Sequence, residues 1–269
     1  MSCLTARRRR DTFRQGDSHK LFMTDNKSGK AYRPVVERLL RNMNPQQILD
    51  APSGHGWLRD ALNETTILDG IDLFCPAPKG YRNFWSVDFS AGLPDTLPHY
   101  DCVVCCEIIA YIGNPLMFLK SARDRLVADG SIVISTPSVW YPQSRIQFLL
   151  RGYFPAVPSW LRDATKADPG HITPITFPNL YMYLSQSGFK NIRLHSVEKG
   201  PKHWFEWLFG IPQWLYCRGQ LRKAITEEAI AFWKAAGSRS ALYERQMVVS
   251  AQRHDREAYM LERPVDIGS

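Results

Sequence analysis

The segment from Ile48 to Leu58 constrains the fold of this chain more than any other. An apolar stretch ends at Asp50, and Gly54 and Gly56 follow before a helical pattern begins. Because an unpaired buried carboxylate is costly, an acidic residue that closes an apolar strand indicates a role other than packing. Glycine lets the backbone approach a ligand without a Cβ in the way. The segment therefore predicts a strand, a tight turn and a helix, with a ligand beside the turn.

A second apolar stretch ends in Asp72, roughly 20 residues further along the chain. At this spacing, nucleotide-binding α/β folds place a carboxylate on the hydroxyls of a ribose. The two segments together predict a nucleoside-containing cofactor that lies across the ends of two parallel strands.

The third glycine of the usual dinucleotide fingerprint is missing. Counted from Gly54, that position holds Arg59, and the chain has no phosphate-cradling Gly-Lys-Ser motif. A ligand with a ribose but no phosphate fits better, and S-adenosylmethionine is the common one. The segment resembles the first motif of the class I S-adenosylmethionine-dependent methyltransferases. It matches that motif at Asp50, Gly54 and Gly56, and has Pro52 in place of the first glycine.

The resemblance continues through two later motifs. The run from Val87 to Ser90 resembles the strand end that contacts the adenine, with Asp88 on the exocyclic amine and Phe89 beside the ring. The run from Tyr100 to Glu107 resembles the fourth strand, whose end lies beneath the methionine part of the cofactor. The resemblance implies cofactor contacts for Asp50, Ala51, Pro52, Gly54, Gly56, Asp72, Leu73, Asp88, Phe89, Cys106 and Glu107.

Strand and helix patterns alternate through the first half of the chain, which predicts a doubly wound, parallel α/β sheet. Asn114 and Pro115 open a helix that we expect to continue past Leu126 to Asp129 and Gly130, with the next strand beginning at Ser131. The family resemblance implies a Rossmann-like sheet of seven strands, with the last strand antiparallel.

The second half predicts four more elements. Thr176, Pro178 and Gly188 bound a helix, and the run from Phe189 to Val197 alternates like a strand. Leu221, Ile225, Ala229 and Phe232 form one amphipathic face of a helix that Gly237 ends. The last strand is expected from Gln246 to Ala251.

The distribution of charge along the chain indicates the domain organisation. Residues 1–33 hold nine basic and three acidic residues, a net charge of +6 out of +8 for the chain. We expect a basic, disordered tail at 1–30, one methyltransferase domain at 31–253 with substrate-side insertions at 138–176 and 199–240, and a polar tail at 254–269. The basic tail is either solvated or in contact with an anionic membrane or nucleic acid.

The positions of the cysteines and the length of the apolar runs argue against several kinds of site and several classes of protein. Cys102 and Cys105 lie three residues apart on a strand, and so they point to opposite faces and are not paired metal ligands. The scattered cysteines favour a reducing cytoplasm over a disulfide framework. No uninterrupted apolar run approaches about 18 residues, and no apolar segment follows Arg7–Arg10, so we expect neither a membrane span nor a secretory signal.

Methyl transfer requires an aligned acceptor in a dry site, and an oxygen or nitrogen acceptor also benefits from a base near neutral pH. His171, in the long excursion after the fifth strand, is the first candidate base, and Tyr111 is the second. A hydrogen-bonded loop histidine with no catalytic role is the alternative for His171.

Some quinone-pathway O-methyltransferases resemble the chain around the fourth strand, where a Glu-x-x-Glu-His run binds a divalent metal. This chain has Ala110 and Tyr111 in place of the second Glu and the His. The change removes two ligands that such a site needs, so we expect a metal-independent reaction.

The aromatic block from Trp204 to Tyr216 is flanked by basic residues, a combination that suits a membrane interface and a lipid-linked acceptor. It equally suits a cap helix, a dimer face or core packing. We expect methyl transfer from S-adenosylmethionine to an oxygen or nitrogen of a small-molecule, glycan or lipid-linked acceptor. The alternatives are a non-catalytic cofactor-binding scaffold and a nucleic-acid methyltransferase, although no Asn/Asp-Pro-Pro-Tyr/Phe motif is present.

Overall fold

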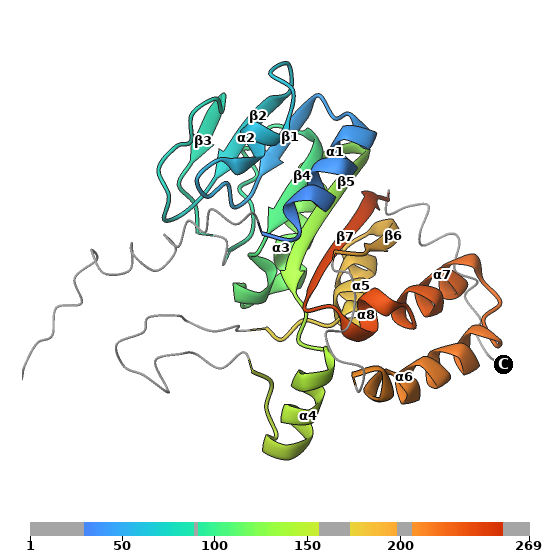
Figure 1. Cartoon of the computed structure of the whole chain (residues 1–269). Coiled ribbons are helices and arrows are strands. Elements are labelled where there is room, and N and C mark those ends of the chain that lie inside the picture. Colours follow the sequence, from blue (N-terminus) through green and yellow to red (C-terminus); the bar gives the residue numbers. More distant parts are fainter. Residues whose placement is uncertain (1–29, 89–90, 156–172, 198–205, 255–269) are drawn as a thin grey trace, which may run out of the picture.

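The computed structural model describes residues 30–88, 91–155, 173–197 and 206–254 (Figure 1). Within them, seven strands form one sheet in the order β3-β2-β1-β4-β5-β7-β6. Their bounds are β1 Gln47–Asp50, β2 Ile67–Ile71, β3 Asn83–Trp85, β4 Tyr100–Cys106, β5 Leu126–Pro137, β6 Phe189–His195 and β7 Gln246–Arg253. β7 pairs antiparallel with both β5 and β6, whereas the pairings from β3 to β5 are parallel. The predicted sheet, with its antiparallel last strand, is confirmed.

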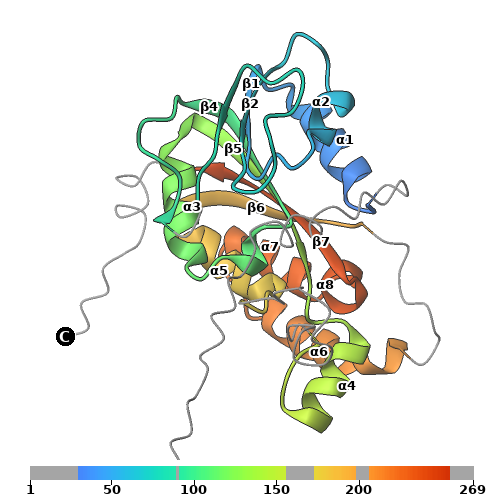
Figure 2. The same cartoon turned by 90° about the vertical axis from the view of Figure 1, so that its left-hand side faces the viewer.

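Helices cover both faces of this sheet (Figures 1 and 2). Their bounds are α1 Arg33–Met43, α2 Trp57–Ala61, α3 Pro115–Asp124, α4 Pro142–Arg151, α5 Phe177–Gln186, α6 Glu206–Leu221, α7 Glu227–Ala236 and α8 Arg239–Tyr243, and a short 3-10 helix, η3, spans Ile109–Tyr111.

Each face of the sheet contributes to its own apolar core because side chains alternate along each strand. On one face, Cys102 packs in a buried cluster with Val36 and Leu40 of α1. On the other, Cys105 packs in a cluster with Leu119 of α3 and Leu180 of α5. Cys102 and Cys105 therefore point to opposite faces, as predicted.

The strand β5 begins earlier than the sequence predicts, and the helix before it ends earlier. α3 ends at Asp124, and β5 already pairs at Leu126, which lies opposite Tyr100 of β4. The next pair joins Cys102 to Ser131, so the residues between form an irregularity inside the strand. Asp129, with φ +56°, bends the chain there. The prediction that Asp129 and Gly130 end the helix is therefore wrong, since both residues lie within β5.

The helix predicted through Leu221, Ile225 and Phe232 is also wrong as one element. α6 ends at Leu221 and α7 begins at Glu227, and Ile225 in the turn between them is 92% exposed. The Thr226 hydroxyl accepts a hydrogen bond from the Ala229 N–H (3.2 Å) and so caps a new helix. Gly237 ends α7, as predicted.

The predicted boundaries of the helix α5 are confirmed. The Thr176 hydroxyl accepts from the Asn179 N–H (3.3 Å), Pro178 stands in the first turn, and Gly188 follows with φ +84°. The strands β6 and β7 also lie where the sequence places them.

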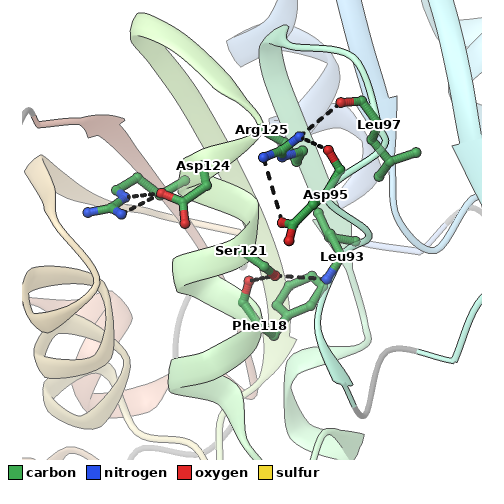
Figure 3. Close-up of polar contacts among 8 residues, drawn as sticks. Leu93, Asp95, Leu97, Phe118, Ser121, Asp124 and Arg125 are labelled. Atoms are coloured by element: carbon green, nitrogen blue, oxygen red, sulfur yellow. Dashed lines mark hydrogen bonds and ion pairs between the residues drawn. The ribbon is translucent and has the colours of Figure 1, made fainter.

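The segment between β3 and β4 is fastened to α3 by polar contacts (Figure 3). The Ser121 hydroxyl accepts from the Leu93 N–H (2.8 Å) and donates to the Phe118 carbonyl (2.7 Å). The Arg125 guanidinium donates to the carbonyls of Asp95 and Leu97. These bonds hold the chain that leads into β4, whose opposite end is part of the candidate site.

α4 lies in the first predicted insertion, and α6 and α7 lie in the second. The boundaries of these insertions and of both tails stay predictions. Among the described residues, no helix combines the length and the apolar character needed to cross a bilayer.

Candidate functional site

The site is built where the parallel strands β2, β1 and β4 end side by side. β1 pairs with β2 on one side and with β4 on the other, so their carboxyl ends share one edge of the sheet. Between β1 and β4 the strand order reverses, and ligands of open α/β sheets bind at such a switch point. Asp50 is the last residue of β1, Asp72 directly follows β2, and Glu107 directly follows β4.

Asp50 is fully buried, and only one of its carboxylate oxygens has a partner among the described residues. Oδ2 accepts a hydrogen bond from the Tyr81 hydroxyl (2.6 Å), and Oδ1 has none. The pKa of the Asp50 carboxyl is raised to about 7, chiefly by burial; the hydrogen bond from Tyr81 lowers the pKa, and the charge of Asp72 raises it. A buried acceptor without a donor is costly, and here it lies at the predicted cofactor edge.

The turn after Asp50 is held by the two neighbouring strands. The Ala51 N–H donates to the Val104 carbonyl (2.9 Å), and the Ser53 N–H donates to the Ile71 carbonyl (2.9 Å). The Ala51–Pro52 peptide bond is cis. The Ser53 hydroxyl is a second buried polar group without a partner in the described part of the chain.

The two glycines of the turn do different things, although both have left-handed backbone conformations. At Gly54 (φ +52°) a Cβ would meet no heavy atom within 4 Å. At Gly56 (φ +80°) it would lie 2.5 Å from Pro78 Cβ and 3.3 Å from the Tyr81 ring. Our expectation that a Cβ at Gly56 would meet a ligand and not the protein is therefore wrong. Gly56 permits packing within the protein, whereas the space at Gly54 is open to a ligand.

The Asp72 carboxylate organises this turn from the neighbouring strand. Its Oδ2 accepts from the Gly54 N–H (2.9 Å), and its Oδ1 accepts from the N–H groups of Phe74 and Cys75 (2.8 Å each). Asp72 is buried, while the adjacent Leu73 is exposed. Three donors on one carboxylate fix its position at the cofactor edge.

At the end of β4, Glu107 adopts φ +63°, a rare conformation for a residue with a side chain. Its Oε1 accepts from the Ser135 hydroxyl (3.3 Å) and from the Gln246 side-chain amide. Burial raises the pKa of Glu107, and Lys30 opposes this most strongly. The thiol of Cys106 is buried, and burial raises its pKa as well.

The segment before α1 belongs to the site, which the sequence analysis missed. Besides Glu107, Lys30 also acts on the pKa of the Cys106 thiol, and its ammonium lies 5.7 Å from the centre of the Tyr32 ring. Tyr32 packs edge-on against Trp57 of α2. Lys30 was counted in the basic tail because charge density alone does not show that the charge of a lysine acts on a distant buried carboxyl.

A second buried carboxylate, Asp69 in the middle of β2, was also missed. It accepts a bidentate pair from Arg82 (3.0 and 2.6 Å), the Asn83 N–H (3.1 Å) and the Tyr100 hydroxyl (3.0 Å). Asp69 therefore joins β2, β3 and β4 within the sheet. Its signal was a charged residue inside an apolar strand, which requires partners.

Of the remaining predicted residues, the structure describes some, and others lie outside the described part of the chain. Tyr111 ends η3, directly after β4, and is half-buried. Asp88 is exposed and lies beyond the end of β3. Phe89 and His171 lie outside the described residues. The described chain resumes at Thr173, which donates to the carbonyls of Ala110 and Ile112 (3.0 Å each) beside Tyr111.

In the part of the chain that the structure describes, no group of three or more His, Cys, Asp and Glu side chains could hold a metal ion.

Comparison with known proteins concerns the family and the fold of this chain. A model of a family described as a methyltransferase domain matches residues 23–194, which is more than half of the chain. No curated protein matches the chain in sequence.

Solved structures of similar fold include an S-adenosylmethionine-dependent methyltransferase from Archaeoglobus fulgidus, with 18% identity, a TM-score of 0.49 and coverage of 84% of this chain and 95% of that one. A second is the 1,6-didemethyltoxoflavin-N1-methyltransferase of Burkholderia thailandensis, with 15% identity, a TM-score of 0.49 and coverage of 89% and 84%. These likenesses carry no argument about the acceptor.

Proposed function

Because this chain belongs to the methyltransferase-domain family and is an S-adenosylmethionine-dependent methyltransferase, we propose that it methylates an oxygen or nitrogen atom of a small-molecule, glycan or lipid-linked acceptor without a metal ion. One observation supports this placement of the site most strongly. The Asp50 carboxylate is buried, one of its oxygens has no partner among the described residues, and the space at Gly54 in the following turn is open. We place the reaction at the carboxyl edge of β1, β2 and β4.

The groups at this edge fit S-adenosylmethionine. When bound, the cofactor supplies an electrophilic methyl group on a positively charged sulfur. Asp50 Oδ1 and the Ser53 hydroxyl offer buried polar atoms that lack partners in the described structure. A carboxylate has about four acceptor sites. Asp72 uses three of them on the turn, so one is left for a ribose hydroxyl.

The flanking residues complete the proposed cofactor contacts. Ala51, Pro52 and Gly54 line the turn, with exposed Leu73 next to Asp72. Asp88 and Phe89 are assigned to the adenine, and Cys106 and Glu107 to the methionine part. Gly56 leaves the room that Pro78 occupies, where a Cβ would clash.

On the acceptor side the chain has to align the acceptor, exclude water and take up a proton. Tyr111, next to the end of β4, is placed to orient an acceptor, and His171 is the proposed base. Neither role requires a metal ion, and the chain lacks the second Glu and the His of the metal-dependent relatives. We propose a cytoplasmic location, in keeping with free thiols at Cys75, Cys102, Cys105, Cys106 and Cys217.

The test of the proposed function is a methyl-label screen. The full-length chain is incubated with S-adenosylmethionine that carries an isotopically labelled methyl group and with fractions of pooled cell extract, with and without a chelator. A labelled small molecule, glycan or lipid in both samples supports the proposal. Label that appears only in nucleic acid, or only when magnesium is restored, contradicts it. Binding of S-adenosylhomocysteine without any labelled product would instead indicate a scaffold.

Once the acceptor is known, His171→Ala tests the base. We expect turnover to fall by about 10² or more, as is typical of a removed acid–base group, with the affinity for the cofactor preserved. Tyr111→Phe is the matched variant for the second candidate. Near-normal turnover in His171→Ala together with a large loss in Tyr111→Phe would transfer the proton-handling role to Tyr111.

A further inference from the structure

We propose that α4 and α6 together form a docking surface for an anionic lipid membrane. We call this two-helix region the α4/α6 surface. Both views place the two helices side by side, beyond the end toward which β5 runs (Figures 1 and 2).

The helix α6 has its apolar and polar sides reversed relative to an ordinary surface helix. Its inward stripe consists of small or polar residues, Glu206, Gly210, Gln213 and Cys217. Its large apolar residues are exposed instead, and they are Trp207, Leu208, Phe209, Ile211, Trp214, Leu215 and Tyr216. A helix next to water buries its apolar side chains, so this arrangement indicates a non-aqueous environment on the outer side.

The inward contacts show that α6 cannot simply rotate to bury its apolar side. A Cβ at Gly210 would lie 1.9 Å from the Tyr243 hydroxyl, so only glycine fits there. The Gln213 side chain accepts from the Trp140 indole N–H and donates to the Ala236 carbonyl (3.2 Å). Glu206 accepts from the Gln143 side-chain amide. These contacts hold the polar stripe against the protein and leave the aromatic and aliphatic side chains outside.

The helix α4 extends the same surface. Leu149 and Leu150 at its end are 84% and 75% exposed, and Phe148 and Tyr153 beside them are also exposed. The Arg145 guanidinium donates to the Phe209 carbonyl of α6 (2.7 Å). The two helices are therefore joined by polar bonds, and both carry exposed apolar side chains.

The charges around this surface match an anionic partner. In residues 138–155 and 206–224 the acidic side chain is Glu206 alone, which is buried, whereas Arg151, Arg218, Arg222 and Lys223 are exposed. The Arg218 guanidinium lies 5.0 Å from the centre of the Trp214 ring. Trp and Tyr with flanking cations are the residues that occupy the headgroup level of membranes, and each cation near an anionic surface adds affinity.

A second copy of the chain fits this surface less well than a lipid surface. In a symmetric dimer the same patch meets itself, and within residues 138–155 and 206–224 the exposed cations would find no exposed acidic partner. Anionic headgroups supply the opposite charge for them. The surface also follows directly from the carboxyl end of β5, on the acceptor side of the sheet, and it would present a lipid-linked acceptor to that site; this last step rests on the proposed function.

The test is co-sedimentation of the full-length chain with vesicles. One set contains neutral phosphatidylcholine only, and the other contains about one third phosphatidylglycerol. We expect binding to the anionic vesicles. The variant Leu149→Gln/Leu150→Gln/Leu215→Gln should lower the partition coefficient by about tenfold or more, because it removes exposed apolar area. Met117→Gln/Met182→Gln alters two exposed apolar residues of α3 and α5, outside the α4/α6 surface; it is the control and should bind like the wild type.

Calorimetric titration with S-adenosylhomocysteine on the same samples separates this proposal from the proposed function, since the triple variant should keep its cofactor affinity. Arg151→Glu/Lys223→Glu should remove the preference for anionic vesicles. Unchanged binding of the triple variant would assign membrane contact to another part of the chain and overturn the proposal. So would a wild type that fails to bind either vesicle, or one that dimerises through this surface without binding vesicles.

Discussion

The carboxyl edge of the sheet and the α4/α6 surface both depart from the usual arrangement of apolar groups inside and polar groups outside, but they depart from it in opposite directions. At the edge, polar atoms of Asp50 and Ser53 are buried without partners among the described residues. At the surface, large apolar side chains such as Leu149 and Trp214 are exposed. Each feature is costly for the chain alone and becomes favourable when the matching partner binds.

The difference indicates the chemistry and size of each partner. A few unpartnered polar atoms beside an open backbone turn fit a small polar ligand that donates hydrogen bonds. A broad apolar surface with cations at its margin fits an extended anionic layer. The edge is also rigid, because Asp72 accepts three backbone bonds around the turn. Precise geometry is required for the cofactor, whereas a membrane surface requires only exposed area and charge.

The largest expected effect tests whether Gly56 supports packing. Gly56→Val should lower the free energy of unfolding by about 3 kcal/mol or more, because the side chain clashes with Pro78 in a left-handed backbone conformation. Chemical denaturation measures this. Gly54→Val is the matched control, since it carries similar backbone strain without a clash, and it should destabilise less while losing cofactor binding. Equal destabilisation of both variants would contradict the distinction between the two glycines.

A second prediction concerns the Asp72 carboxylate. Asp72→Ala leaves the N–H groups of Gly54, Phe74 and Cys75 without their acceptor, and it removes the proposed ribose contact. We expect the affinity for S-adenosylmethionine to fall at least about tenfold, corresponding to about 1.4 kcal/mol. Titration calorimetry measures it, and circular dichroism checks the fold. Asp72→Asn, which keeps one acceptor oxygen, should lose less, and wild-type affinity in a folded Asp72→Ala would reject the assignment.

A third prediction follows from the raised pKa of Asp50, about 7. Since the carboxyl binds its proton more tightly in the folded state, its contribution to stability is fully present below pH ~4 and is lost as pH rises through 7. Asp50→Asn should remove this dependence, so the stability of the wild type relative to the variant should fall by on the order of 3 kcal/mol between pH 4 and pH 8. A constant difference across that range would contradict the assignment.

The same group predicts a smaller effect on cofactor binding. If a donor of the cofactor bonds to ionised Asp50, binding near pH 6.5 should release a proton, and the affinity should rise several-fold from about pH 6 to pH 8. Titration calorimetry in buffers of different ionisation enthalpy detects the proton. Proton uptake on binding would show that the cofactor prefers the protonated carboxyl.

The smallest expected effect is on the stability of the α4/α6 surface itself. Leu149→Gln should change the free energy of unfolding by less than about 0.5 kcal/mol, because its side chain is already exposed. Leu180→Ala, on the buried side of α5, should cost about 2–5 kcal/mol in the same denaturation experiment. A large loss in Leu149→Gln would mean that this surface is part of the folded core and not a docking surface.

Local sequence patterns determined a large part of the fold and of the candidate site. Asp50, Gly54 and Asp72 lie at the ends of neighbouring strands, where the sequence predicts them, and caps such as Thr176 placed helices correctly, because strand periodicity, caps and turns depend on neighbours in sequence. One predicted boundary was wrong because a segment distant in the sequence decides the local structure. Asp129 lies within β5 because β4 pairs on both sides of it. The break between α6 and α7 has instead a local cause that was missed, since Thr226 caps a separate helix.

Only the tertiary structure decided what each group faces. Two glycines of one turn look alike in the sequence, yet Pro78 and Tyr81 make one of them a packing position. The charge of Lys30, before α1, lowers the pKa of Glu107 at the end of β4, although the two residues are far apart in the sequence. From the sequence alone, the aromatic residues of α6 could equally be part of the core. They are exposed because Tyr243 leaves no room for a side chain at Gly210, and because Gln213 is hydrogen-bonded to Trp140 and Ala236 on the inner side of the helix. Burial is a property of the whole packing, so residue order alone does not contain it.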